Sequence, residues 1–203
     1  MPSGTLWSKY NLGVNPEDLS TAESWYGNYY AGGELEEKAG WDGQGTKVLY
    51  DWPTYKYANG SERKLTKYCN NSNYGNNGFT DNLTQLVPED DVATVTNSAW
   101  RMPTEAELEE LVALPNEWVD NYNGISGLNG RVFTGKNGNT LFIPAASYRD
   151  GSDIYDVGSS CFLWSSSLTL GYPYCACYLY FDSDSIYMDD CHRCCGLSVR
   201  PVC

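Results

Sequence analysis

Residues 102–114 read MPTEAELEELVAL and carry the strongest local structural signal in the chain. Thr104 is a favoured N-cap residue, and Glu107, three residues later, completes a capping box in which each side chain accepts a hydrogen bond from the other residue's backbone. Leu111 and Leu114 belong to an apolar stripe with a spacing near that of a helical turn. The pattern predicts an amphipathic helix, and we expect its glutamates to lie on the solvated face.

The segments around this helix predict an α+β domain. Before it, VPEDDVATV (87–95) places a proline and three acids where a second helix would start. After it, RVFTGKNGNTLFIPAAS (131–147) is typical of a hairpin with a Gly/Asn turn. Further short strands are predicted at TLWSKYNLG (5–13), CFLWSSSL (161–168), CYLYFD (177–182) and GLSVRPV (196–202). Two helices followed by a run of short strands favour an antiparallel sheet with helices packed on it.

Length and composition agree with this class. A chain of 203 residues suits a single domain over 1–203, and it is too short to argue for two. Its 17 Tyr and 20 Gly, with only 19% charged residues, favour short strands and long loops over helix bundles. Residues 34–82 are rich in Gly, Asn, Tyr and turn signals, and we expect them to be long surface loops.

The charge of the chain excludes some partners. A net charge of −13 argues against a nucleic-acid partner or an anionic membrane surface, because phosphate binding needs basic side chains. No apolar run approaches the roughly 20 residues of a membrane span, so direct membrane insertion is not expected. The start, MPSGTLWSKYNLG, has neither a basic nor an apolar leader region and predicts no signal peptide in this chain.

A cysteine-rich stretch near the C-terminus leaves three interpretations open. YMDDCHRCC (187–195) contains three cysteines, two aspartates and the only histidine of the protein. Cysteine and histidine are zinc ligands, although no two matched Cys-x2-Cys pairs are present. His192 beside a cysteine also suits a catalytic thiol, provided that the base reaches the sulfur in space. The third interpretation is a surface on which these residues do no covalent chemistry.

The composition of 169–203 separates these interpretations. This segment contains no Lys, Glu, Gln, Asn or Trp, although all five occur earlier. Its unusual positions hold mainly Tyr, Cys, Asp, Ser and His, which arise when an asparagine codon ending in a pyrimidine changes at its first two bases. Other residues interrupt this set, notably Pro173, Ala176, Leu179, Phe181 and Arg193. The pattern indicates randomised positions interleaved with a constant scaffold.

With this pattern in view, the chain resembles the C-type lectin-fold variable proteins of diversity-generating retroelements, in the branch of that fold that includes the formylglycine-generating enzyme. The versions found in gut Bacteroidetes and their phages are the most similar. The matching pieces are LWSKYNLG (6–13), PEDDVATV (88–95), WRMPTEAELEEL (100–111), NGNTLFIPAASYRDG (137–151), LWSSSL (163–168) and GLSVRPV (196–202). Together they extend over most of the chain and imply a single C-type lectin-like domain.

In that family a reverse transcriptase miscopies template adenines, so that asparagine codons become randomised residues. The resemblance therefore implies a variable ligand-binding segment at about 169–195. Its expected variable residues are Tyr172, Tyr174, Cys175, Cys177, Tyr178, Tyr180, Asp182, Ser185, Tyr187, Asp189, Asp190, Cys191, His192, Cys194 and Cys195. Met188 cannot arise from such a codon, so we expect it to be scaffold. We expect Arg193 to be scaffold as well.

The function implied is non-enzymatic binding, of the receptor or adhesin type, to a protein or glycan ligand on a cell or phage surface. The protein itself would then be located at the cell surface, outside the cell or on a phage virion. No catalytic residue, metal ligand or cofactor is assigned, and calcium is the one structural ion that the resemblance allows. The alternative is a copper oxidase like the formylglycine-generating enzyme, or a metal-binding protein, using the Cys/His cluster.

Strand periodicity gives specific expectations for the variable segment. Leu179 and Phe181 should enter the core, while Tyr178, Tyr180 and Asp182 alternate with them and face solvent. Ala176 breaks this alternation, which predicts a bulge or turn near Cys177. We expect Cys175, Cys177, Cys191, Cys194 and Cys195 to be largely solvent-accessible. The closing LSVRPV should be a central strand that flanks the variable segment on both sides, with the N-terminal strand near it.

Overall fold

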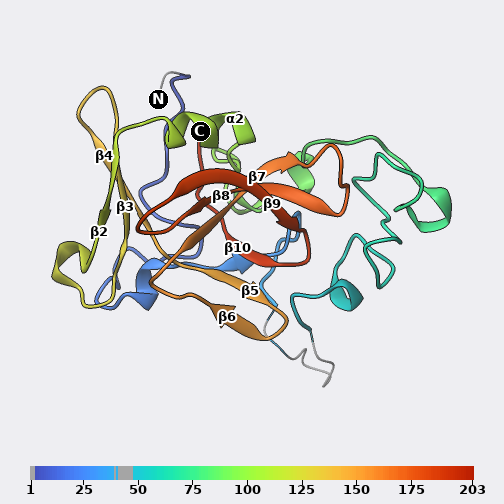
Figure 1. Ribbon diagram of the computed structural model, residues 1–203, viewed down its shortest axis with the longest axis horizontal. Helices are drawn as coiled ribbons and strands as arrows, with labels where there is room; N and C mark the ends of the chain where they lie inside the picture. The colour runs from blue at the N-terminus through green and yellow to red at the C-terminus, as the bar shows by residue number, and fades with distance from the viewer. Residues whose placement is uncertain (1–2, 39, 41–47) are drawn as a thin grey trace.

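The computed structural model describes residues 3–38, 40 and 48–203, and these residues form an α+β fold with two α-helices and mostly sheet (Figure 1). The larger sheet has the order β6-β5-β10-β7-β8-β9, with β1 paired to β10. Its strands are β1 (Tyr29–Tyr30), β5 (Tyr148–Asp150), β6 (Asp153–Tyr155), β7 (Cys161–Leu168), β8 (Cys175–Phe181), β9 (Ile186–His192) and β10 (Gly196–Ser198). The smaller sheet contains β2 (Asn116–Val119), β3 (Gly130–Thr134) and β4 (Thr140–Pro144). Among the described residues, no helix has the length and apolar character needed to span a membrane.

Both predicted helices are present. Helix α2 (Glu105–Val112) begins at the predicted capping box: the Thr104 hydroxyl accepts from the Glu107 N–H at 3.3 Å, and the Glu107 carboxylate accepts from the Thr104 N–H at 2.9 Å. Helix α1 (Val92–Thr96) starts later than its acidic run suggested, after a 3-10 turn at Pro88–Asp90. The Asp91 side chain caps α1, since it accepts from the first free N–H groups of the helix.

Glu107 is an exception to the expectation that the helix glutamates are solvated. Its side chain is buried, and it receives two hydrogen bonds from the Arg101 guanidinium, at 2.7 and 2.5 Å. The Thr5 hydroxyl donates a third, at 2.7 Å. Because Arg101 also forms a backbone bridge with Val202, this one carboxylate links α2 to both ends of the chain.

The C-terminal segment lies at the centre of the fold. Strand β10 pairs with β1 and β5 in antiparallel fashion and with β7 in parallel, so the sheet is mixed rather than wholly antiparallel as expected. Its position also corrects the expectation that it flanks the variable segment on both sides. Residues 175–192 form their own hairpin on the far side of β7, which therefore separates them from β10.

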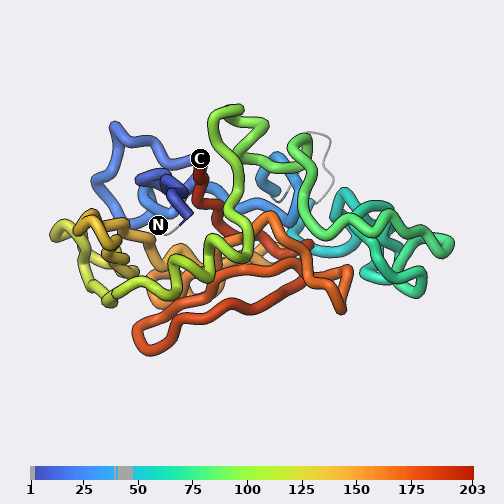
Figure 2. The backbone as a smooth tube through the Cα atoms, turned by 90° about the horizontal axis from the view of Figure 1, so that it is seen from above, coloured from blue at the N-terminus to red at the C-terminus, as the bar shows by residue number. Residues whose placement is uncertain are grey.

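The two ends of the chain lie side by side (Figures 1 and 2). The predicted N-terminal strand is reduced to a single bridge between Trp7 and Val202, but hydrogen bonds to the C-terminal segment continue along it, including Leu12 N–H to the Val199 carbonyl at 2.8 Å. The expectation that the N-terminal strand lies near the C-terminal strand is therefore confirmed.

Arg200 is a buried cation in this central segment, with 1% of its surface exposed. Its guanidinium donates to the Asn11 side chain at 2.8 Å and to the backbone carbonyls of Ser8, Lys9 and Phe142, at 3.2, 2.6 and 3.2 Å. All of these acceptors are neutral, and burial lowers the pKa of Arg200 to about 9. The side chain thus ties the N-terminal segment and β4 to the C-terminal strand by hydrogen bonds.

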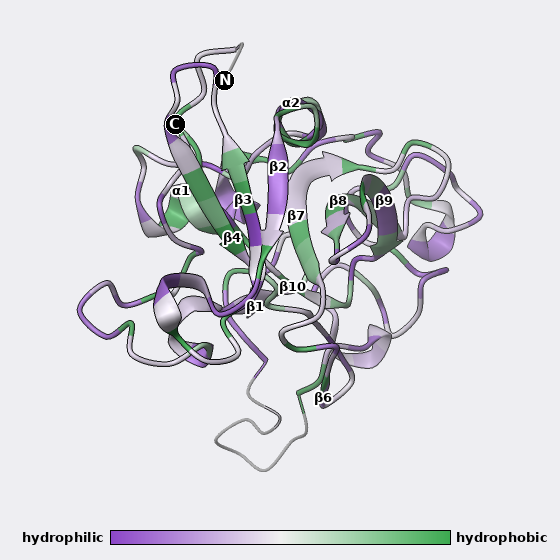
Figure 3. Ribbon diagram, turned by 60° about the vertical axis from the view of Figure 1, so that its left-hand side comes forward, coloured by the Kyte–Doolittle hydropathy of each residue, from purple (hydrophilic) through white to green (hydrophobic). Residues whose placement is uncertain are grey.

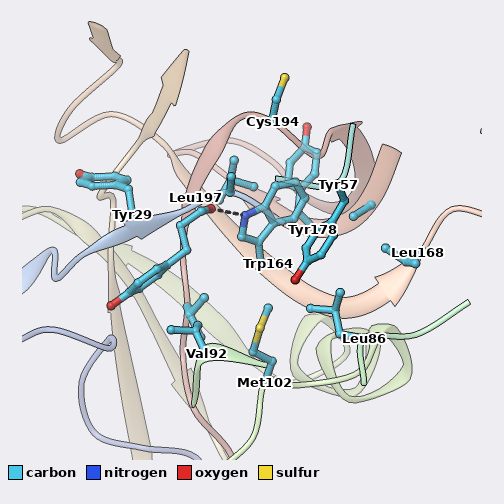
Figure 4. Close-up of a cluster of buried hydrophobic side chains, with 14 of the residues drawn as sticks. Tyr29, Tyr57, Leu86, Val92, Met102, Trp164, Leu168, Tyr178, Cys194 and Leu197 are labelled. Atoms are coloured by element: carbon cyan, nitrogen blue, oxygen red, sulfur yellow. Dashed lines mark hydrogen bonds between the residues drawn. The ribbon is translucent and has the colours of Figure 1, made fainter. Parts of the chain in front are cut away.

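Strands β7 and β8 are covered on both faces. On one face Leu179 and Phe181 pack with Leu108 and Leu111 of α2, which confirms the inward orientation predicted for the two β8 residues. On the other face Tyr178 packs beside Trp164, whose indole N–H donates to the Tyr30 carbonyl at 2.7 Å (Figure 4). The expectation that Tyr178 faces solvent is therefore wrong, because this second face is also part of the core. Figure 3 shows the hydrophobic residues gathered on β3, β4 and β7.

Residues 34–82 are long loops with short 3-10 turns in their described part, as expected, but they are not only a surface. Residues 39 and 41–47 of this range lie outside the described residues. Four tyrosines from these loops are buried in the cluster around Trp164: Tyr50, Tyr55, Tyr57 and Tyr68. Their hydroxyls find backbone partners, for example Tyr55 to the Gly32 carbonyl at 2.6 Å. The loops therefore close one side of the core.

The burial of Leu179 makes a prediction about stability. Leu179→Ala should lower the free energy of unfolding by about 2–5 kcal/mol, because it empties a fully buried site between β7 and α2. Tyr187→Ala, the matched control on the neighbouring strand, removes a side chain that is 45% exposed and should cost about 1 kcal/mol or less. Urea unfolding of both variants measures the difference, and equal losses would contradict the inside/outside assignment.

The Glu107 contacts predict a dependence of stability on pH. Hydrogen bonds from Arg101 are the largest cause that lowers the pKa of Glu107 to about 2, with further bonds from Thr104 and Thr5 acting against burial. A depressed native pKa stabilises the fold above the unfolded-state pKa, and this contribution is lost as pH falls from about 4.5 to 2. Wild-type protein should lose about 2–3 kcal/mol over this window through this group.

Thermal melts of Glu107→Gln across the same pH range provide the measurement. The variant should be less stable near neutral pH and should lose less on acidification than the wild type. Glu109→Gln, an exposed position on the same helix, is the control and should keep the wild-type slope. A wild-type slope in Glu107→Gln would show that other carboxylates carry the acid sensitivity.

Candidate functional site

The fifteen expected variable positions are brought together by one β-hairpin at the edge of the larger sheet. Strands β8 and β9 pair in register from Cys175–His192 to Phe181–Ile186, and β9 has no further strand beside it in the described sheet. Figure 2 shows this hairpin along one outer side of the molecule, in orange to red. Strand β9 itself was not predicted, because its side chains do not alternate between apolar and polar as those of β8 do.

These positions differ in exposure. Four are exposed (Tyr172, Tyr187, Asp189, His192), seven are half-buried (Tyr174, Tyr180, Asp182, Ser185, Asp190, Cys191, Cys195) and four are buried (Cys175, Cys177, Tyr178, Cys194). The expectation of largely accessible cysteines is therefore wrong for Cys175, Cys177 and Cys194 and only partly met for the other two. For Cys175 and Cys177 the physical reason is that β8 lies between β7 and β9 and is covered on both faces. Cys194 follows β9 and is buried in the cluster around Trp164.

The residues expected to be scaffold point inward. Met188 is half-buried and packs against the cluster that contains Leu179 and Phe181. Arg193 is fully buried, and its guanidinium lies over the rings of Tyr55 and Tyr68, at 5.5 and 5.9 Å from their centroids. Because its backbone also bonds to Tyr174 and Gly32, Arg193 anchors the end of the variable segment.

Asp182 holds the hairpin turn rather than facing freely outward. Its carboxylate accepts from the backbone N–H groups of Asp184 and Ser185, at 2.8 and 2.7 Å, and from the Tyr180 hydroxyl at 2.8 Å. Arg131 of β3 also donates to the Asp182 carbonyl, at 3.0 Å. The carboxylate and the backbone carbonyl of Asp182 are thus both engaged in contacts that stabilise the turn.

The irregularity expected near Cys177 is present, but it lies in the facing strand. The pairing of β7 with β8 shifts between Trp164 and Leu168, while β8 continues regularly against β9. Inside the shift, the Ser165 hydroxyl donates to the Cys177 carbonyl at 2.8 Å. The bulge therefore belongs to the serine run of β7, for which the sequence predicted a regular strand.

A row of aromatic side chains crosses the larger sheet and connects the β8–β9 hairpin to the rest of the protein. We call it the aromatic ladder: Tyr155, Tyr148, Phe162, Tyr180 and Tyr187, from β6, β5, β7, β8 and β9. Successive ring centroids along it are 5.3, 4.6, 5.2 and 4.9 Å apart. Three of its members lie outside 169–195 and were missed. The signal for two of them was YRDGSDIY, whose Gly-Ser turn at 151–152 places Tyr148 opposite Tyr155.

A second aromatic group lies at the other end of the hairpin. The His192 ring is 5.6 Å from the ring of Trp52 and 5.6 Å from that of Tyr174, and Tyr172 lies 5.8 Å beyond Tyr174. Trp52 comes from the long loops, so this group also combines expected variable positions with a residue from outside 169–195. Both aromatic groups offer ring surface to a ligand.

The C-terminal thiols form a cluster with unequal acidity. All eight cysteines of the chain are free. The neighbouring thiols of Cys191 and Cys194 lower the pKa of Cys195, and the proximity of Cys195, together with burial, raises the pKa values of Cys191 and Cys194. Over the described ranges, no three His, Cys, Asp or Glu side chains are arranged to hold a metal ion.

Comparison with protein-family models, with curated proteins and with solved structures found no match to this chain.

The thiol geometry predicts an order of alkylation. At pH 6, iodoacetamide should modify Cys195 before Cys175, Cys177 and Cys194, because Cys195 is partly exposed and has the lowered pKa. Cys191→Ala removes one of the thiols that lower the pKa of Cys195 and should slow the reaction at Cys195. Peptide mass spectrometry measures the order, with Cys69→Ala as the control that leaves the rate unchanged. Equal modification of Cys194 and Cys195 would contradict the unequal acidity.

Proposed function

We propose that this protein binds a ligand through residues 169–195 and does not catalyse a reaction. On this proposal the domain is C-type lectin-like, and its C-terminal surface is diversified by a retroelement through adenine-directed mutagenesis. The ligand would be a protein or glycan presented on a cell or phage surface, where this protein would act as a receptor or adhesin.

The separation of side chains within the β8–β9 hairpin is the observation that carries the proposal. Leu179 and Phe181, which alternate with expected variable positions along β8, and Arg193, which interrupts them, are fully buried. Tyr187, Asp189 and His192, which are expected variable positions, are exposed on the edge strand of the same hairpin. Randomising the second kind of position alters a surface while the first kind keeps the backbone in place.

The residue types suit recognition. Tyrosine presents a large amphipathic surface at a low cost in side-chain entropy, as it does in antibody loops. Tyr172 and Tyr187 are among the most exposed large side chains of the described residues, and Asp189 adds exposed hydrogen-bond acceptors beside them. The four buried positions carry one tyrosine and three cysteines, so the outer eleven positions are the ones that support ligand contact.

A display experiment tests the proposal. In one library, ten exposed or half-buried positions, that is, all of them except Asp182, which holds the turn, are randomised with the codons that arise from asparagine codons by changes at adenines. A matched library randomises Leu179, Phe181, Met188 and Arg193 instead. The first should keep most members folded and yield binders to a panel of purified proteins, whereas the second should lose folded display, because buried truncations each cost about 2–5 kcal/mol.

The locus provides the contradicting outcome. Diversification requires a near-copy of the sequence encoding 169–195, with asparagine codons at the fifteen positions, close to a reverse-transcriptase gene. If sequencing of the locus finds neither, or if sibling sequences differ at Leu179 and Phe181 as often as at Tyr187, the diversification part of the proposal is wrong.

A further inference from the structure

The binding face extends beyond the variable segment through the aromatic ladder. Tyr155 and Tyr187, at its two ends, are 41% and 45% exposed, and the three inner rings are half-buried. Neighbouring rings meet at 49° between Tyr148 and Phe162 and at 75° between Phe162 and Tyr180, while Tyr148 and Tyr155 are stacked at 22°. A sugar ring stacks on an open aromatic face, which the three half-buried inner rings do not offer. Interlocked aromatic rings of this kind are typical of the centre of a protein–protein interface.

The charge around the ladder has one sign. Residues 150–203 contain seven aspartates and no lysine, and their two arginines, Arg193 and Arg200, are both buried. The nearest preceding cation is Arg149, whose guanidinium lies over the Tyr29 ring, 5.0 Å from its centroid. Side chains alternate along β5, so Arg149 points to the face opposite the one on which its neighbour Tyr148 joins the ladder. The exposed surface of this part of the chain therefore presents carboxylates with no lysine or arginine among them, and His192 is its one exposed basic side chain.

Several of these carboxylates lie along the ladder itself. The Tyr180 hydroxyl donates to Asp182 at 2.8 Å. Burial is the largest cause that raises the pKa of Tyr180 to about 12. The hydrogen bond to Asp182 and the nearby Asp182, Tyr187 and Asp156 side chains raise it further. Burial and the charges of Asp150 and Asp156 raise the pKa of Tyr148 as well. Asp156, which directly follows Tyr155 in the chain, thus contributes to the raised pKa of both Tyr148 and Tyr180.

We propose that the aromatic ladder and its carboxylates bind a segment of a partner protein that carries arginine or lysine side chains. This inference rests on the proposed function and adds the chemical class of the ligand. Cationic side chains are attracted to the faces of tyrosine rings and to the adjacent carboxylates. A second copy of this chain does not fit the face, because it would bring the same carboxylates and a net charge of −13 against them.

The proposed binding face combines residues from inside and outside the segment 169–195. Tyr148, Tyr155, Phe162 and Asp156 lie outside the variable segment and would supply the attraction for a basic partner in every variant of the protein. Tyr180 and Tyr187 lie inside it and would change which basic partner fits. The chemical class of the ligand is therefore constant on this proposal, while its identity varies.

Fluorescence anisotropy with a synthetic peptide tests the inference on the full chain. The probe is a fluorescein-labelled peptide of alternating arginine and serine, and its counterpart with glutamine in place of arginine is the matched neutral probe. The arginine peptide should bind, and its affinity should fall as salt is added. Tyr155→Ala and Asp156→Asn should each weaken it by about two- to fivefold, while Tyr155→Phe keeps the ring face and should retain binding.

The variants are chosen to keep the fold. Asp156 adopts a positive φ of 56°, a conformation that asparagine accepts at least as readily as aspartate. Glu109→Gln removes an exposed charge from α2, which packs on the opposite face of the sheet, and should leave the affinity unchanged. Melting temperatures of all variants confirm that affinity is compared between folded proteins.

Three results would overturn the inference: equal binding of the glutamine peptide, equal loss of affinity in Glu109→Gln and Asp156→Asn, or displacement of the arginine peptide by a neutral oligosaccharide.

The proposed function fails in a different way. If Tyr155 and Asp156 matter but replacement of Tyr187, Asp189 and His192 changes no ligand preference, the fixed face binds and the variable segment does not. If those replacements change the ligand while Tyr155→Ala and Asp156→Asn are neutral, the proposed function stands and the basic partner is wrong.

Discussion

The last eight residues are the constraint on which the rest of the structure depends. Residues 196–202 are all buried, and their backbone pairs with the N-terminal segment, with β1, β5 and β7, and with Arg101. A backbone buried so completely must have its N–H and C=O groups paired, because an unpaired group would cost about 1–3 kcal/mol. Arg200 adds a buried guanidinium whose acceptors come from the N-terminal segment and from β4. The C-terminal strand thus gathers distant parts of the sequence around itself.

This arrangement leaves the preceding segment free to lie at the edge. Because β7 occupies the place beside β10, the β8–β9 hairpin is added outside β7, and β9 ends the sheet. Arg193 anchors the last turn of the hairpin under the loop tyrosines, and Asp182 with Arg131 anchors the other end. Between these anchors, inward-facing residues stabilise the hairpin and outward-facing ones contribute little to it. A surface built in this way can change its chemistry with small effects on the fold.

Tyrosine has two roles in this protein. In the long loops it replaces aliphatic core residues, since a ring can fill the interior while its hydroxyl satisfies a backbone carbonyl, as Tyr50 does with Tyr29 at 2.7 Å. On the sheet it forms the aromatic ladder, where rings from five strands touch and stay partly exposed. The same residue type therefore closes the core on one side and offers a contact surface on the other.

The sequence by itself determined the local elements. Helix α2 and its capping box, the β3–β4 hairpin, strands β7 and β8 and the inward orientation of Leu179 and Phe181 follow from spacing and alternation, because these depend only on neighbouring residues. Tertiary structure alone decided the burial of Glu107, Tyr178 and the three inner cysteines. It also decided the shift in β7, the parallel pairing of β10 and the ladder that joins Tyr148 and Phe162 to Tyr180 and Tyr187. Each of these depends on which segment covers which face, and that choice is made by contacts between residues far apart in the chain.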